Sequence, residues 1–356
     1  MMGSYDFMAS TAPTKLVVDY EWHAVSTVKF RAADIPPRYI RTALWLAHVH
    51  GLAANQIWMW GRNGWSGDAK IAAEFGGADF VYSVWTQPQL VAAYIHASLE
   101  LNSLSEFVVG LAAAPRRLHL LYSASSAMLS DTAYIEQQLA LYSLAAQLGV
   151  NVGFVSTSVK HLTQTGDPAC TTKTPCTVLI PCMTAISAQI VAELRTGVDG
   201  IRALIAGNSS VCQAAFQRNE FGETLAPADR QTMLGLDAYD IGPVAGAAAL
   251  AALELKLRPS LVERPIICTD SNLSGRVVFG VHCRSAVIGT QIALVVSNLL
   301  NHTISVSLIR AGDPDADENS TMRLTFANNG TAVPVDASAP SKLVLDSLVT
   351  MALWVN

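Results

Sequence analysis

The pattern of polar and apolar positions near the start of the chain predicts a strand with two different faces. In the run Leu16 to His23, every charged or titratable group except the Tyr20 hydroxyl has the same parity. The residues of this parity are Val17, Asp19, Glu21 and His23. The residues of the opposite parity are Leu16, Val18, Tyr20 and Trp22. Because successive side chains of a strand point to opposite faces, each set is expected on one face.

A second strand of the same kind is predicted from Gln56 to Arg62. In this run Gln56, Trp58, Trp60 and Arg62 alternate with Ile57, Met59 and Gly61. A helix opened by Asp34-Ile-Pro-Pro37 and ended by Gly51 separates the two strands, which is the βαβ unit of a parallel sheet or barrel. A polar and aromatic inner face is typical of a (β/α)₈ barrel strand near its functional end. Parity alone fits an ordinary α/β sheet equally well.

Strands and helices continue to alternate through the middle of the chain. Strands are predicted at 118–122, 150–156, 177–181 and 201–206, and helices at 88–107, 131–148 and 187–195. This alternation indicates a doubly wound parallel α/β sheet. The sequence contains neither G-x-G-x-x-G nor a P-loop pattern, so nucleotide binding has no support.

From about Arg276 the sequence changes to short runs in which apolar and polar residues alternate, and clusters of Asn, Gly, Asp and Pro separate these runs. Such runs, the first at 277–281 and the last at 343–355, predict a small antiparallel β-sandwich. The predicted organisation therefore has three parts. They are a barrel end with a following helix at 1–110, an α/β domain at 112–265, and a sandwich at 266–356.

Composition narrows the function classes. The chain is 51% hydrophobic and 14% charged, which is typical of a globular protein with a large core. Its net charge of -5 gives no sign of the basic surface that nucleic-acid binding requires. The Ala-rich run Val244 to Leu257 is too short to span a bilayer. Met1 to Thr14 lacks the pattern of a signal peptide, yet five N-x-S/T sequons hint at a secretory route. They lie at Asn208, Asn272, Asn301, Asn319 and Asn329.

The six cysteines form no C-x-x-C pair and have no histidine at metal-like spacing, so neither zinc nor another cofactor is predicted. Cys170 and Cys176 flank a Thr/Lys/Pro loop. They could form a local disulfide in an oxidising compartment, although two separate thiols are the expected state.

The two strands resemble the seventh and eighth barrel strands of family 42-type β-galactosidases. The motifs that carry the resemblance are Val-Asp-Tyr-Glu-Trp-His around Glu21, the helix from Tyr39 to Gly51, and Ile57-Trp-Met-Trp-Gly-Arg62. Asn219-Glu-Phe-Gly-Glu223 is similar to a short acidic turn after the α/β sheet. In that family the barrel precedes an amidotransferase-like domain that forms trimers, and then a β-sandwich, so the resemblance covers nearly the whole chain as an architecture.

For function, the resemblance implies a retaining glycosidase acting on a β-galactoside or related carbohydrate, with Glu21 as nucleophile. His23, Trp58, Trp60 and Arg62 would line the sugar site. The family's acid/base glutamate follows the fourth barrel strand, and only 20 residues precede Glu21, so this chain is expected to be a fragment without it. Asp19 has the right parity but lies deeper in the strand, and we do not expect it to substitute.

Two alternatives stay open beside the hydrolase. One is a non-catalytic oligomerising or carbohydrate-binding remnant, and the other is an unrelated α/β enzyme. An amidotransferase-type cysteine nucleophile needs a glycine-flanked turn after a strand, which Cys182 in Pro-Cys-Met lacks. The resemblance also implies that the protein is a homo-oligomer, such as a trimer.

Overall fold

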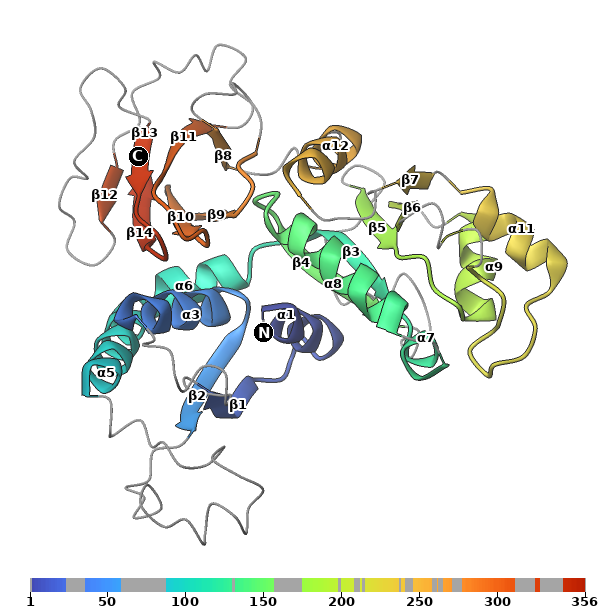
Figure 1. Cartoon of the computed structure of the whole chain (residues 1–356), viewed down its shortest axis with the longest axis horizontal. Coiled ribbons are helices and arrows are strands. Elements are labelled where there is room, and N and C mark those ends of the chain that lie inside the picture. The colour runs from blue at the N-terminus through green and yellow to red at the C-terminus, as the bar shows by residue number, and fades with distance from the viewer. Residues whose placement is uncertain are drawn as a thin grey trace, which may run out of the picture.

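The computed structural model describes most of the chain and groups its strands into four sheets (Figure 1). The described residues are 2–23, 36–58, 88–129, 132–156, 175–197, 200–207, 212, 215–236, 238–240, 246–257, 261, 265–270, 277–310, 324–326 and 342–355. The predicted α/β fold class is confirmed, because a parallel sheet and a pair of antiparallel sheets follow one another along the chain.

The first sheet is a parallel pair, β1 (Val17–His23) and β2 (Leu52–Trp58), joined by helix α3 (Pro37–Val49). Proline suits the start of α3, because the first N–H groups of a helix have no intrahelical partner. Two more helices, α5 (Pro88–Ser103) and α6 (Ser105–Ala112), pack on α3. The predicted order of strand, helix and strand is confirmed. The second strand, predicted at 56–62, begins earlier, at Leu52, and residues 59–62 lie outside the described residues. The single helix predicted at 88–107 is divided at Leu104.

The central sheet is parallel, with the strand order β4-β3-β5-β6-β7. Its strands are β3 (Arg116–Tyr122), β4 (Asn151–Ser156), β5 (Cys176–Ile180), β6 (Ile201–Gly207) and β7 (Ala238–Asp240). The helices are α7 (Ala124–Leu129), α8 (Thr132–Ala146), α9 (Ala188–Thr196), α11 (Pro227–Leu234) and α12 (Ala247–Leu257). Leu179 of β5 belongs to the core with α8 and α12, whereas Val178 and Ile180 belong to the core with α9 and α11. Both faces are therefore covered, as doubly wound sheets require.

The last two sheets are antiparallel and pack against each other through an apolar core. One has the order β13-β11-β8 and the other β12-β14-β10-β9. Their bounds are β8 (Ile266–Asp270), β9 (Val281–Ile288), β10 (Gln291–Asn298), β11 (Ile304–Arg310), β12 (Leu324–Phe326), β13 (Lys342–Leu345) and β14 (Thr350–Val355). The strand predicted at 277–281 is wrong: Gly280 has a φ of 81°, which turns the chain, and β9 begins only at Val281.

The parts of the fold share cores. The ring of Phe107 in α6 lies 6.2 Å from that of Trp45 in α3 and 4.9 Å from that of Trp354 in β14, so the helices of the first part cover one face of a sandwich sheet. An unpredicted helix, α1 (Met2–Thr11), lies at the centre of the molecule and packs on β4 (Figure 1). Among the described residues, no helix has the length and apolar character needed to cross a membrane.

Candidate functional site

The residues predicted to bind and cleave a sugar are partly brought together by β1 and β2. Glu21 and His23 lie in β1, Trp58 is the last residue of β2, and the backbone of His23 is the register partner of Trp58. For these three residues the structure describes the backbone and not the side chains. Trp60 and Arg62 lie outside the described residues. The parallel pairing places the carboxyl ends of both strands together, which is where βα-barrel sites are built.

The prediction that each parity of β1 keeps to one face along the whole strand is wrong. The pairing with β2 is irregular between Asp19 and Trp22, where β1 holds one more residue than its partner, as in a β-bulge. Val17 and Trp22, which have opposite parity, are both buried, at 7% and 0% exposure. Because an extra residue reverses the alternation, Trp22 joins the helix-covered face and Glu21 occupies the irregular part of the strand.

One face of the strand pair packs on helices and the other is open. Trp22 and Ile57 belong to a core with residues of α3 and α5. By contrast Tyr20 is 70% exposed, and Gln56 is exposed as well. The prediction that Gln56 and Ile57 face opposite sides is confirmed. The exposed side chains lie on the face away from α3 and α5, and in a (β/α)₈ barrel the face away from the helices points inward.

Asp19 is engaged elsewhere in the molecule. Its carboxylate accepts a hydrogen bond of 2.6 Å from the hydroxyl of Tyr5 in α1. That bond contributes to raising the pKa of Tyr5, after the larger effect of burial. Asp19 therefore points to the α1 side of the strand pair, which supports the expectation that it does not replace an acid/base residue.

A buried cluster of titratable side chains, which sequence reasoning missed, lies where the three parts of the fold meet. Asp6 of α1 accepts hydrogen bonds from His50 Nδ1 at 2.6 Å and from the Tyr142 hydroxyl at 2.7 Å. The Nε2 atoms of His50 and His282 lie 2.9 Å apart. Arg284, two residues along β9, is 1% exposed, and its guanidinium has no hydrogen-bond partner among the described residues. We call these five residues the junction cluster.

The charge states of the junction cluster follow from burial and from each other. Burial favours a raised pKa for Asp6, but His50, Arg284 and the Tyr142 hydroxyl outweigh it and hold the pKa below its usual range. Burial lowers the pKa of His50 in spite of the attraction of Asp6, and burial with the neighbouring charges lowers the pKa of His282 well below its usual value. At neutral pH both histidines are therefore uncharged, and Asp6 faces Arg284 as the opposite charge.

These states fix the tautomers of the two imidazoles. The ionised Asp6 can only accept, so His50 donates from Nδ1 and its Nε2 carries a lone pair. His282 must then donate from Nε2 to that lone pair. Its Nδ1 is left as an acceptor, and this atom has no partner among the described residues. A short chain of hydrogen bonds thus runs from Asp6 through His50 to His282.

The junction cluster predicts that acidification weakens the fold. His50 and His282 have folded pKa values below the ordinary value of about 6.5, so the unfolded chain binds protons first as the pH falls. Stability is therefore complete above about pH 6.5 and is lost below it, by up to about 2.7 kcal/mol per pH unit for two protons. Urea unfolding between pH 7 and pH 5 measures the slope. His282→Asn should reduce it, and a flat profile in the unchanged protein would contradict the assignment.

Disulfides account for the cysteines that the structure describes. Cys182 after β5 is bonded to Cys212 after β6, with their Cα atoms 4.9 Å apart, and Cys268 of β8 is bonded to Cys283 of β9. Cys176 is disulfide-bonded as well, so a free thiol there was the wrong expectation; Cys170 lies outside the described residues. A bonded Cys182 is unavailable as an amidotransferase-type nucleophile. Structural disulfides are typical of proteins that fold in oxidising compartments.

No family model and no curated protein matches the chain. Among solved structures, the GH42 exo-carrageenase from Bacteroides ovatus is similar with a TM-score of 0.69 at 19% identity, over 99% of this chain and 43% of that one. Gan42B, a GH42 β-galactosidase from G. stearothermophilus, is similar with a TM-score of 0.63 at 11% identity, over 99% and 56%. The β-galactosidase from Bacillus circulans sp. alkalophilus gives 0.57 at 12% identity, over 90% and 52%.

These similarities show the fold and bear out the resemblance at that level. Nearly the whole chain superposes on part of GH42 structures, at low sequence identity. The chain spans about half the length of the solved chains that it matches. Which residues react, and with what substrate, has to be argued from the site.

Proposed function

We propose that this chain provides the nucleophile-bearing end of a retaining glycoside hydrolase of the β-galactosidase type. The observation that carries the proposal is the parallel unit β1–α3–β2, whose register sets His23 beside Trp58 at the carboxyl ends of both strands. This unit belongs to a chain with the fold of GH42 glycosidases along 99% of its length. A carbohydrate is accordingly the proposed substrate class.

In the proposed mechanism the carboxylate of Glu21 attacks the anomeric carbon as the bond to the leaving oxygen breaks. A second carboxylic acid about 5 to 5.5 Å away protonates that oxygen. Water, deprotonated by the same residue, then attacks the glycosyl ester and releases the sugar and Glu21. Trp58 and Trp60 would stack on the sugar ring, and His23 and Arg62 would bond its hydroxyls. The acid/base residue would come from barrel strands beyond the described residues.

A non-catalytic role is the second candidate, and the contact of Asp19 favours it for the chain acting alone. Asp19 is bonded to Tyr5 on the side of α1, and it is the carboxylate nearest to Glu21 in β1. Without a second acid the strand pair would hold a sugar, or another copy of the chain, and would not cleave. The two candidates make different predictions for covalent labelling.

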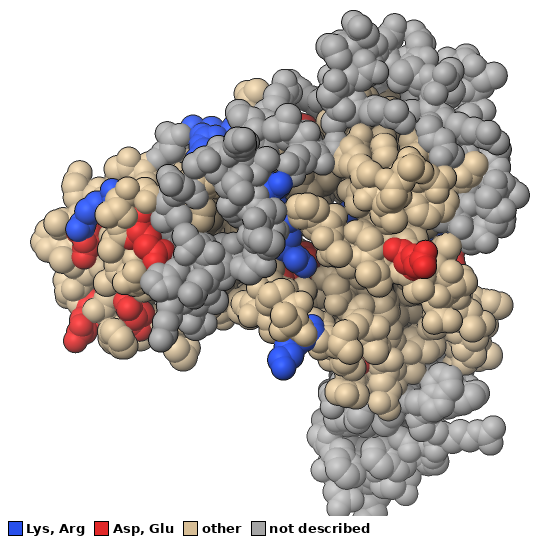
Figure 2. Space-filling model, turned by 180° about the vertical axis from the view of Figure 1, so that it is seen from behind, with Lys and Arg blue, Asp and Glu red and all other residues tan. Residues whose placement is uncertain are grey.

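Self-association is part of the proposal, as the resemblance to the trimer-forming galactosidases implies. Met128, Leu129 and Phe221 are exposed by 79%, 51% and 80%, and they come from one end of the α/β sheet. In Figure 2 charged side chains gather at the end of the molecule that carries α9 and α11, beside these three residues, and much of the remaining described surface is uncharged. Exposed apolar side chains that lie close to one another favour an interface.

The test is labelling of the full-length natural protein with 2-deoxy-2-fluoro-β-galactosyl fluoride. Fluoride leaves without strong acid assistance, and the fluorine at C2 slows hydrolysis of the ester, so the reagent reports the nucleophile even where the acid is weak. We expect a covalent ester on Glu21, located by tandem mass spectrometry of the peptide.

Two matched variants control the labelling. Asp19→Asn should be labelled like the unchanged protein, whereas Glu21→Gln should not be labelled. An ester on another carboxylate would disprove the assignment of Glu21. A protein that neither reacts with the reagent nor cleaves an aryl β-galactoside would support the non-catalytic candidate.

A further inference from the structure

The loop between β10 and β11, residues 299–303, carries an N-x-S/T sequon that the structure describes. Asn301, His302 and Thr303 match the pattern, with a residue other than proline at the middle position. All three residues are exposed. The other four sequons, at Asn208, Asn272, Asn319 and Asn329, lie outside the described residues. Asn301 is therefore the sequon whose surroundings can be judged.

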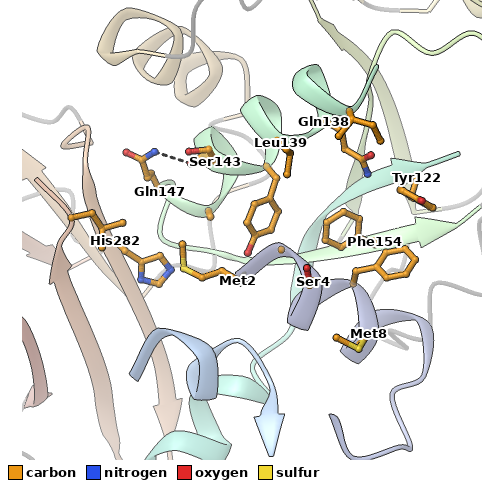
Figure 3. A pocket seen from close by; sticks show the side chains of 16 residues that line it. Met2, Ser4, Met8, Tyr122, Gln138, Leu139, Ser143, Gln147, Phe154 and His282 are labelled. Atoms are coloured by element: carbon orange, nitrogen blue, oxygen red, sulfur yellow. Dashed lines mark hydrogen bonds between the residues drawn. The ribbon is translucent and has the colours of Figure 1, made fainter. Parts of the chain in front are cut away.

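The base of this loop is held against the protein. The buried side chain of Asn298 donates to the carbonyl of His302 at 2.8 Å, and its Oδ1 accepts from the N–H of Leu300 at 2.9 Å. Leu299 lines the cavity shown in Figure 3, and its N–H donates to the carbonyl of Gly280 at 2.9 Å. These contacts fix the start of the loop, and the sequon that follows is left in solvent.

The side chain of Asn301 is available for reaction. Its Oδ1 lies 3.2 Å from Nδ1 of His302, and no other hydrogen bond ties this amide to the described residues. The hydroxyl of Thr303 donates to Asp346 at 2.9 Å in an exposed contact. A sugar chain attached to Asn301 would therefore extend into solvent and displace no buried side chain.

The cysteines of the same sandwich indicate the compartment in which it folds. Cys268 of β8 and Cys283 of β9 form a disulfide that joins the two sheets, and both residues are buried. The loop 299–303 connects the same two sheets. Structural disulfides form in oxidising compartments, and the secretory route, where N-linked sugars are added, is one of these. Two independent features of one domain thus point to the same route.

We propose that Asn301 is a site of N-linked glycosylation. The sugar donor is a lipid-linked oligosaccharide pyrophosphate, and the acceptor is the amide Nδ2 of Asn301. The bond between the anomeric carbon and the pyrophosphate oxygen breaks as Nδ2 forms its bond to that carbon. Nδ2 loses one proton, and the lipid pyrophosphate leaves with the bonding electrons. The modification is independent of the proposed glycoside hydrolysis, because Asn301 belongs to the sandwich and Glu21 to β1.

Peptide mapping of the full-length natural protein tests the site. Trypsin should release residues 285–310, whose only asparagines are Asn298 and Asn301. Peptide N-glycosidase in heavy-oxygen water converts a glycosylated asparagine into an aspartate that carries one heavy oxygen. We expect this label on Asn301 and not on Asn298, which is outside a sequon and is the internal control.

Variants of the full-length chain, secreted from a eukaryotic host, separate the sequon from other causes of a mass change. By intact mass spectrometry, Asn301→Gln and Thr303→Ala should each lose one sugar chain. Thr303→Ser should retain it, because serine keeps the hydroxyl that the sequon requires. Asn102→Gln is the matched control, since Asn102 is exposed on α5 and has Leu104 at the position of the hydroxyl residue.

Two results would overturn the proposal: an Asn301 without the label in the natural protein, or an Asn301→Gln variant that carries as many sugar chains as the unchanged chain. The substituted residues are exposed, and circular dichroism checks the fold of each variant. The labelling of the natural protein decides the question even if a variant does not fold.

Discussion

Replacing Asp6 with alanine is expected to lower the free energy of unfolding by about 3 to 5 kcal/mol. Asp6 is fully buried and is the acceptor for both His50 and Tyr142. It also provides the negative charge opposite Arg284. Burial lowers the pKa of Arg284, and the attraction of Asp6 opposes that effect. Its removal leaves two donors unpaired and a buried cation without its counter-charge, and each of these is costly.

Urea unfolding followed by tryptophan fluorescence measures the loss, and Asp229→Ala is the matched control. Asp229 pairs with Arg195 at the surface, where the two side chains are 25% and 48% exposed. An exposed ion pair contributes about 0 to 1 kcal/mol, so the control should unfold close to the unchanged protein. Equal losses in the two variants would show that the junction cluster contributes no more to the free energy of unfolding than a surface ion pair does.

Replacing Glu21 with glutamine in the full-length natural protein is expected to reduce kcat/KM on an aryl β-galactoside on the order of 10³-fold or more. The amide is nearly isosteric with the carboxylate but is too weak a nucleophile to form the glycosyl ester. Initial rates with a chromogenic substrate measure the loss. Asp19→Asn changes the same chemical group in the same strand, and it should retain most of the activity because Asp19 is bonded to Tyr5.

The outcome separates the proposed nucleophile from a merely structural glutamate. A structural role would show as a loss of stability in Glu21→Gln, whereas loss of the nucleophile leaves the unfolding midpoint near that of the unchanged protein. Full activity in a stable Glu21→Gln variant would assign the nucleophile to another residue. It would leave the fold similarity to GH42 structures untouched.

Periodicity predicted the order of elements well, because local patterns decide which side of a strand or helix is apolar. The parallel pair around α3, the doubly wound sheet and the antiparallel sandwich all follow from such patterns. It failed in β1, where a residue added within the strand reverses the alternation before Trp22. A bulge depends on the pairing partner, so the spacing of side chains within one strand does not reveal it.

Helix α1 and the junction cluster were beyond sequence reasoning for a related reason. The apolar positions of Met2–Thr11 have no clear helical periodicity, and the helix is stabilised by its contacts with β4. Asp6 and His282 are far apart in the sequence, and each looks like an ordinary polar residue. The sequence contained one hint of the junction cluster. His50 lies in the segment from Tyr39 to Gly51 that carries the family resemblance, but the resemblance assigns His50 no partner.

The sequence by itself determined the fold class, the order of the parts and the strand that carries Glu21, because these depend on patterns within short segments. Tertiary structure alone decided that Asp6, His50, Tyr142 and His282 meet in one buried chain of hydrogen bonds, since four segments must fold together before those contacts exist. It also decided that Asp19 turns to Tyr5, because a carboxylate's partner is set by the elements packed around it.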